Sequence, residues 1–313
     1  MLKHNQVQFV CIEPAHYGQR LDNFLFRHLK GLPRSRIYRL IRRGEVRINK
    51  KRSKPNTRLN KGDMVRIPPH EPMQHDIPPK PGSGLCELIE RSVLHEDENL
   101  LIINKPAGIA VHGGSGIRLG LIEAIRQIKP QWQDTELVHR LDRDTSGCLV
   151  LCKNLNFLRD LQAQLKNTSV KKDYLALVFG QWPGDLHEVV APLQKNILSS
   201  GERMVQVDRD GKKSVTRIVV QQRYQQATLI QATPKTGRTH QIRVHCQVSK
   251  HSIVGDTKYR AGHERSPNQL LHYKSLCLHA QRIAFKKPFS DQLIVVEAPL
   301  HEHLVKLLNS IKN

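Results

Sequence analysis

A proline-rich stretch between residues 70 and 84 divides the chain into two parts with different patterns. It contains Pro78, Pro79 and Pro81 and few apolar side chains, so we expect a linker. The 313 residues are enough for two unequal domains whose cores need no covalent cross-links. We predict an N-terminal extension over 1–17, a first domain over 18–69, the linker over 70–84 and a second domain over 85–313.

The first domain has the pattern of amphipathic helices followed by short strands. Apolar residues between 20 and 30 fall on one helical face. Ser35 is placed to cap a second helix that Gly44 would end. A turn at Lys50-Lys51 and another at Gly62-Asp63 then separate two short strands.

The positive charge is concentrated in this first part. Fifty Lys and Arg against 28 Asp and Glu give the chain a net charge of +22. Sixteen basic and three acidic residues lie between 18 and 67, so this segment carries +13 (16 − 3). Such a field attracts RNA, DNA or an anionic membrane, and a solvated basic surface is the alternative interpretation. The cations expected to lie off the apolar face and follow a phosphate backbone are Arg36, Arg39, Arg42, Arg43, Arg47, Lys50 and Lys51.

The second part is dominated by strand-like runs. Residues 149–151, 174–179, 215–220 and 228–232 have strand patterns, and residues 119–128 and 155–165 have helical spacing. No regular alternation of strand and helix is present. This pattern favours an α+β fold with a largely antiparallel sheet over a doubly wound fold.

Several familiar functional motifs are missing from the sequence. It has no phosphate-binding P-loop, no GxGxxG motif and no complete nucleophile elbow, and His139 and His279 have no partners at metal-ligand spacing. The six cysteines form no CxxC pair, which argues against disulfides and fits a reducing cytoplasm. No apolar run is long enough to span a bilayer, and the first residues do not fit a secretory signal.

Two polar clusters remain as candidate sites. VHRLDRDTSG (138–147) packs acids, arginines and hydroxyls directly before an apolar strand. From the pattern alone, a solvated turn capped by Asp144 and an active site are equally good interpretations. TGRTHQIRVH (236–245) places cations at what looks like the start of a helix, and a phosphate-contacting basic face is its alternative interpretation.

The two clusters resemble the motifs of the RluA-type pseudouridine synthases. HRLDRDTSG resembles the family signature, and TGRTHQIRVH followed by IVGDTKY resembles a later motif. NKPAGIAVHGG (104–114) and KDYLALV (172–178) match two further blocks in the same order. In the first domain RLDNFL, SRIYRLIRRGEVRINKK and LNKGDMVRI resemble the S4 RNA-binding domain. The polar stretch 260–270 lies outside these motifs and is a candidate variable insertion.

The resemblance implies roles for particular residues. It places the catalytic carboxylate at Asp142, with Asp144 as a lower-ranked rival, and its basic partner at Arg243. It implies that Tyr174 stacks on the target base and that Arg140 fills the gap left when the uridine leaves the RNA stack. Further residues expected to bind substrate or line the cleft are His139, Thr145, Arg238, His240, Lys105 and His112.

The resemblance therefore implies an RNA pseudouridine synthase that isomerises uridines in 23S (large-subunit) ribosomal RNA. The reaction needs no metal or organic cofactor in principle, because nothing is oxidised and no group is donated. We expect a cytoplasmic monomer whose partner is ribosomal RNA and which binds no membrane. The same chemistry on transfer RNA, and a non-catalytic RNA-binding protein of ribosome assembly, remain alternatives.

Overall fold

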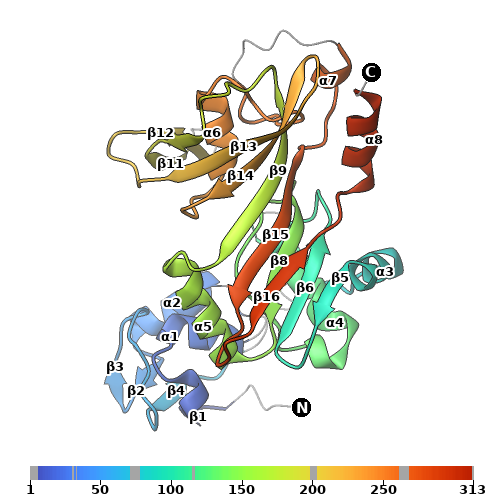
Figure 1. The fold of residues 1–313 in the computed structure, drawn as a ribbon. Helices are drawn as coiled ribbons and strands as arrows, with labels where there is room; N and C mark the ends of the chain where they lie inside the picture. Colours follow the sequence, from blue (N-terminus) through green and yellow to red (C-terminus); the bar gives the residue numbers. More distant parts are fainter. Residues whose placement is uncertain are drawn as a thin grey trace. The chain divides into compact units, whose positions relative to one another are not determined.

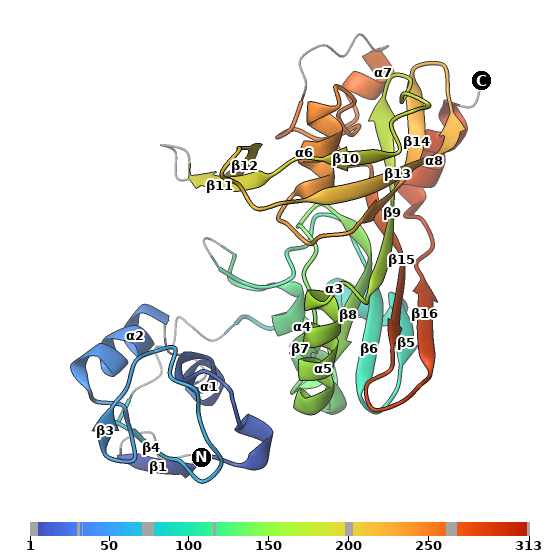
Figure 2. The same cartoon turned by 60° about the vertical axis from the view of Figure 1, so that its left-hand side comes forward.

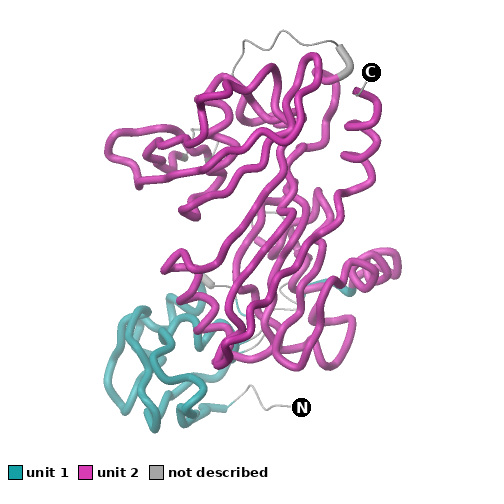
Figure 3. Tube along the Cα trace, viewed as in Figure 1, with its two compact units in different colours: residues 1–80 teal, residues 81–313 magenta. Residues whose placement is uncertain are grey.

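The computed structural model describes residues 6–29, 32, 34–70, 78–114, 117–197, 203–260 and 268–311. The chain forms two compact units, Met1–Lys80 and Pro81–Asn313, which Figure 3 distinguishes by colour. Residues 261–267 of the candidate insertion 260–270 lie outside the described residues, as do residues 71–77 of the linker expected over 70–84.

The first unit is a four-stranded antiparallel sheet with two helices. The strands pair in the order β1 (Gln8–Cys11), β4 (Met64–Ile67), β2 (Arg47–Ile48) and β3 (Lys51–Arg52). The helices are α1 (Leu21–His28), α2 (Arg34–Arg43) and the short 3-10 helix η1 (Pro14–His16). Strand β1 lies in the segment that we assigned to an extension, so this segment contributes to the sheet of the first unit.

The ends of α2 test two predictions. The helix begins at Arg34, so Ser35 lies inside its first turn and the prediction that Ser35 caps it is wrong. Gly44 ends the helix as predicted, because its φ of 72° is a conformation that side chains with a Cβ rarely adopt. The core between helices and sheet is formed by α1, α2 and inward-facing strand residues, including Phe24, Ile37, Leu40, Ile48, Val65 and Ile67.

The second unit is built on a ten-stranded sheet (Figure 1). In order of pairing its strands are β10 (Glu188–Val190), β13 (Val215–Arg223), β14 (Ala227–Pro234), β9 (Lys171–Phe179), β15 (Leu278–Lys286), β8 (Ser146–Cys152), β6 (Leu100–Lys105) and β5 (Val93–Glu96). Strand β16 (Leu293–Glu297) pairs with β15, and β7 (Glu136–Leu137) pairs with β8. All of these pairs are antiparallel except β15 with β8. The α+β fold with a mainly antiparallel sheet is confirmed.

Helices cover both faces of this sheet at strand β6, whose apolar side chains point to both faces. Leu101 and Ile103 of β6 pack with helices α3 (Ser83–Arg91) and α4 (Leu121–Ile128). Leu100 and Ile102 point to the other face, toward α5 (Leu155–Lys166). Because successive strand residues alternate between faces, an unbroken apolar run such as 100–103 requires this cover on both sides.

A second core lies around the other half of the sheet. It joins β9, β13 and β14 to α6 (Gln241–Val248), α7 (Asn268–Leu271) and α8 (Glu302–Ser310) (Figure 2). A two-stranded ribbon, β11 (Leu193–Ile197) with β12 (Arg203–Val207), packs on α6 through Leu193 and Val205. The 3-10 helix η3 (Pro130–Trp132) completes the elements of this unit.

Three further findings concern disulfides, membrane-spanning helices and groups of metal-binding side chains. All six cysteines are free thiols. Among the described residues, none of the helices has the length and apolar character needed to cross a bilayer. The described His, Cys, Asp and Glu residues form no group of three or more that could hold a metal ion.

Candidate active site

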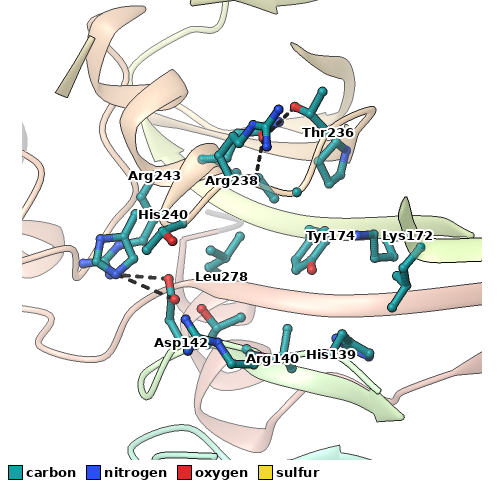
Figure 4. Close-up of a pocket in the computed structure, with 18 of the residues that line it drawn as sticks. His139, Arg140, Asp142, Lys172, Tyr174, Thr236, Arg238, His240, Arg243 and Leu278 are labelled. Carbon is teal, nitrogen blue, oxygen red and sulfur yellow. Dashed lines mark hydrogen bonds and ion pairs between the residues drawn. The ribbon is translucent and has the colours of Figure 1, made fainter. Parts of the chain in front are cut away.

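The two polar clusters of the sequence meet at one pocket of about 360 Å³ in the second unit. One wall is the segment 139–145 that leads into β8, and another is the segment 236–243 that leads into α6. Residues Lys172 and Tyr174 of β9 lie between them (Figure 4). Segments about a hundred residues apart in the chain are therefore adjacent here.

Asp142 projects into the pocket from the turn before β8. The start of β8 is fixed against β15, where Gly147 pairs with Ala280. A Cβ at position 147 would lie within 3 Å of the Ala280 backbone, so only glycine allows this approach. Ser146 adds a 2.8 Å hydrogen bond to the buried His279. The turn that carries Asp142 is thus anchored to the centre of the sheet.

Two basic side chains of the α6 segment, the guanidinium of Arg243 and the imidazole of His240, face the Asp142 carboxylate. Arg243 Nη1 lies 3.7 Å from Oδ2, and His240 Nε2 lies 3.7 Å from Oδ1 (Figure 4). Asp142 is about a third exposed, with 30% side-chain accessibility, whereas Arg243 is buried at 8%. The carboxylate can therefore reach a ligand in the pocket, while the Arg243 cation beside it stays buried.

Arg243 is itself held by a buried carboxylate. Its Nε and Nη2 donate to both oxygens of Asp256 at 2.7 and 2.8 Å. The Tyr259 ring lies 4.9 Å from the guanidinium carbon. Burial disfavours the charged guanidinium, but the hydrogen bonds and charge of Asp256, together with Asp142, raise the pKa of Arg243 above its ordinary value. Arg243 is a permanent cation with a fixed orientation.

His240 has a strained backbone and a fixed ring. Its φ of 52° places it in the left-handed region directly before α6. Its Nδ1 lies 2.6 Å from the hydroxyl of Tyr259, which in turn accepts a hydrogen bond from the backbone N–H of Val205. In this pair either His240 Nδ1 donates to the Tyr259 hydroxyl or the hydroxyl donates to Nδ1, depending on which ring nitrogen of His240 carries the proton. Burial lowers the pKa of His240, and the Asp142 charge opposes the shift.

Tyr174 provides an aromatic surface next to the carboxylate. It is half-buried on β9 and packs against the cores on both halves of the sheet. Burial, reinforced by the charge of Asp142, raises the pKa of its hydroxyl, so the phenol stays neutral. A neutral, fixed ring can stack on a planar base.

The comparisons with known proteins identify the family. The family model described as RNA pseudouridylate synthase matches residues 99–248, and the S4 domain model matches residues 19–65. Ribosomal large subunit pseudouridine synthase C of Pasteurella multocida is 47% identical over 307 residues, which cover 98% of this chain and 94% of that protein. The chain belongs to the RNA pseudouridylate synthase family.

Other relatives agree with this family. Ribosomal large subunit pseudouridine synthase C of Escherichia coli (strain K12) is 46% identical over 312 residues, covering 98% of this chain and 97% of that protein. The solved structure titled Human RNA Pseudouridylate Synthase Domain Containing 4 covers 73% of this chain and 95% of its own, with a TM-score of 0.60 and 24% identity. That likeness supports the fold. The sequence resemblances to this family and to the S4 domain are confirmed.

Several other residues singled out in the sequence also line the pocket. Arg140 and Arg238 are exposed at its rim, where they can reach an anionic ligand. Thr145 is buried, and its hydroxyl has no hydrogen-bond partner among the described residues. His139 lines the pocket too, but its Nε2 accepts the Val150 N–H at 3.1 Å. Burial lowers the pKa of His139 to about 3, so the ring is neutral and supports the backbone of β8.

Lys105, which we expected to bind substrate or line the cleft, does not line this pocket. The structure favours a supporting role for it over a direct contact with substrate. Its side chain is fully buried, and Nζ donates to the carbonyls of Pro106, Ile109 and Arg143 at 2.7 to 2.9 Å. These three acceptors use all of the donors of an ammonium group. Burial lowers the pKa of Lys105 to about 7, against the attraction of Asp144 and Asp142. The residue ties the turn containing Asp142 to the segment after β6.

The rival carboxylate and the predicted cleft histidine also lie elsewhere. Asp144 forms an exposed ion pair with Arg143 at 3.1 Å and lines a different pocket of the second unit. His112 is described but does not line the pocket that contains Asp142. Asp142 is the carboxylate that faces both Arg243 and His240.

Some residues of the site carried no assigned role in the sequence. Asp256 and Tyr259 lie in the IVGDTKY motif, and their contact with Arg243 is visible only in the fold. Lys172 precedes Tyr174 by two residues on β9 and lines the same pocket, and burial lowers its pKa. The alternation of side chains along a strand was the signal that could have added Lys172 to the prediction.

A buried histidine on α6 makes the stability of this region pH-dependent. His245 is fully buried, with Nε2 2.8 Å from the hydroxyl of Ser214. That hydroxyl donates to the Ala191 carbonyl, so it accepts from His245, and Nδ1 has no partner among the described residues. Burial lowers the pKa of His245 from 6.5 to about 4.

Between pH 6.5 and about 4, His245 is protonated in the unfolded chain and neutral in the folded chain. The unfolding free energy therefore falls as the pH falls through this range. We expect His245→Gln to reduce the slope of the unfolding free energy between pH 6 and 5 by about 1 kcal/mol per pH unit, somewhat below the limit of about 1.4 for one whole proton. Urea unfolding at both pH values measures this slope. The exposed His187 provides the control, since His187→Gln should leave it unchanged. An unaltered slope in His245→Gln would mean that this histidine is already protonated in the folded state.

Proposed function

We propose that this protein isomerises uridine to pseudouridine in large-subunit ribosomal RNA. One observation carries the proposal: the Asp142 carboxylate, paired with the fixed cation Arg243, faces a pocket beside the aromatic ring of Tyr174. The names of the relatives at 46 and 47% identity support the choice of RNA, because both are called ribosomal large subunit pseudouridine synthase C.

The chemistry required fits these side chains. The N1–C1′ bond breaks, the uracil turns in place, and C5 bonds to C1′ while the C5 proton leaves to solvent and N1 gains a proton. We assign Asp142 to the reacting sugar or base, with the Arg243 cation beside it. Tyr174 stacks on the uracil as it turns, since stacking tolerates in-plane rotation.

The target base must also leave the RNA stack to enter the pocket. We assign Arg140, which is exposed at the rim, to the gap that the uridine leaves, and Arg238 to neighbouring phosphates. Thr145 and His240 complete the polar lining around Asp142. His139 and Lys105 support the backbone that presents it.

The first unit supplies the positive surface. We propose that residues 18–69, with β1 added to their sheet, form the RNA-binding domain, that 70–84 link it to the synthase domain, and that the latter spans 85–313. The structure describes all seven lysines and arginines that we expect to contact phosphates in this domain. Arg36 is partly buried, and the other six are exposed. They provide affinity that salt should weaken. We further propose that the protein works as a monomer in the cytoplasm.

Release of tritium from uracil C5 tests the proposal directly. Transcripts of large-subunit rRNA, small-subunit rRNA and transfer RNA are labelled with tritium at C5 and incubated with the protein in separate reactions. We expect release from large-subunit rRNA alone. Release only from transfer RNA would change the substrate, and tight binding without release from any transcript would indicate a non-catalytic RNA-binding protein.

A further inference from the structure

The sheet of the first unit has one face that its helices do not cover. Val65 and Ile67 of β4 and Ile48 of β2 point inward to the core with α1 and α2. The alternate residues point the other way, as the exposure along β1 and β4 shows. This outer face carries Phe9 and Cys11 of β1 together with Met64 and Arg66 of β4.

One row of side chains crosses all four strands on this face. Phe9 pairs with Arg66, Arg66 with Arg47, and Arg47 with Arg52. Residues that pair across strands lie on the same face, about 5 Å apart. The row therefore sets an aromatic ring at one end of a line of three guanidinium groups.

The aromatic end of the row is open to solvent. Phe9 is 64% exposed and the neighbouring Met64 is 40% exposed. They line a groove of about 610 Å³ with Arg47, Arg66 and the turn residues Asn49 and Lys50. Exposed apolar side chains gathered with cations in one groove are typical of a binding surface and not of a merely solvated face.

The three arginines are oriented but keep donors for a ligand. Each makes a hydrogen bond to a backbone carbonyl near the end of α2: Arg47 to Gly44, Arg52 to Arg43 and Arg66 to Glu45. None of the three forms an ion pair with an acidic residue that the structure describes. The nearby Asp63 accepts hydrogen bonds from Asn49 and from the Asn60 backbone. The row is thus a net positive surface.

We infer that this outer face binds an unpaired nucleotide of the RNA substrate, with its base stacked on Phe9 and the adjoining phosphates on Arg47 and Arg66. The inference rests on the proposed action on RNA and adds a site separate from the uridine pocket. A flat ring beside planar guanidinium groups suits a base and its phosphates. An acidic peptide would use the cations alone, and it would gain little from an exposed phenylalanine.

Substitution of the ring tests the stacking contact. Loss of base stacking on an aromatic side chain weakens binding by about 1–3 kcal/mol, which is roughly 5- to 150-fold. We therefore expect Phe9→Ala to raise the Kd for an rRNA fragment by a factor in this range, and to raise KM without lowering kcat. Phe9 is exposed, so the fold should persist, which circular dichroism checks. Tyr17→Ala is the matched control, because Tyr17 is 61% exposed in the same unit but does not line the groove.

A fluorescent probe at the same position gives an independent measurement. The chain has two tryptophans, Trp132 and Trp182, and both are buried. In Phe9→Trp the new indole should emit as an exposed group in the free protein and be quenched when RNA stacks on it. Tyr17→Trp should show no such quenching.

The outcomes separate this inference from the proposed function. Unchanged Kd in Phe9→Ala, or no quenching in Phe9→Trp while RNA is bound and modified, overturns the stacking site and leaves the proposed function intact. A shielded, blue-shifted indole in the RNA-free Phe9→Trp protein also overturns it, because the face would then be packed against protein. Wild-type protein that binds no RNA contradicts the proposed function itself.

Discussion

Asp142→Asn is expected to slow the release of tritium from uracil C5 in large-subunit rRNA by at least about 10³-fold. Asparagine has nearly the same shape but carries no negative charge, so it can neither attack nor accept a proton. The pairing with Arg243 at 3.7 Å would be lost, while the turn that β8 anchors should keep its shape. Single-turnover assays with saturating enzyme measure the chemical step and exclude an effect on RNA affinity.

Asp144→Asn is the matched control for this prediction. Asp144 is two residues away, is partly exposed and forms an ion pair with Arg143 outside the uridine pocket. Its substitution should change the rate by only a few fold, as expected for the loss of an exposed pair. If Asp142→Asn kept activity near that of the control, Asp142 would not be the catalytic carboxylate.

Asp256→Asn is expected to destabilise the second unit by about 3–5 kcal/mol, because it removes the buried carboxylate that is hydrogen-bonded to the buried Arg243. Asp256 is 1% exposed and accepts both hydrogen bonds of the guanidinium. Its Oδ1 also accepts the backbone N–H groups of Lys258 and Tyr259. In asparagine the amide N–H₂ would face either Arg243 or these backbone donors, so one donor loses its acceptor.

Urea unfolding measured at pH 7 gives the size of this effect, and tritium release gives its consequence for Arg243. We expect a lower urea midpoint of unfolding and a lower rate of tritium release. The rate falls because the Arg243 guanidinium, no longer fixed by Asp256, is not held in its position beside Asp142. Asp291→Asn serves as the control, because Asp291 pairs with Lys286 at a fully exposed position and should leave both quantities unchanged. A midpoint equal to that of the wild type would contradict this prediction and would show that water replaces the Asp256 oxygens as acceptors for Arg243.

The elements of the second unit were largely predictable from periodicity. The helical spacing at 119–128 and 155–165 gave α4 and α5, and the strand patterns gave β8, β9, β13 and β14. These segments are long and strongly apolar on defined faces, which makes the local pattern decisive. The start of α2 was harder, because arginine and serine at its first positions give no apolar signal and several residues can begin such a helix.

Lys105 shows that a residue of a family motif can lie away from the pocket that the motif helps to form. A lysine within a motif of an RNA enzyme suggests a phosphate contact, and nothing in the local sequence indicates burial. Burial follows because β6 is an interior strand, paired with β5 on one side and β8 on the other, and the fold places three carbonyls around Nζ. The same lysine on an edge strand would have remained in solvent.

The sequence by itself determined the α+β class, the concentration of positive charge before residue 70, and the two polar segments that contain Asp142 and Arg243. These properties depend on residue type and on spacing over a few turns or strands. Only the tertiary structure brought those segments to 3.7 Å from each other and placed Asp256 behind Arg243. Contacts between residues a hundred positions apart depend on how strands pair, and a one-residue shift in pairing would turn each side chain to the opposite face.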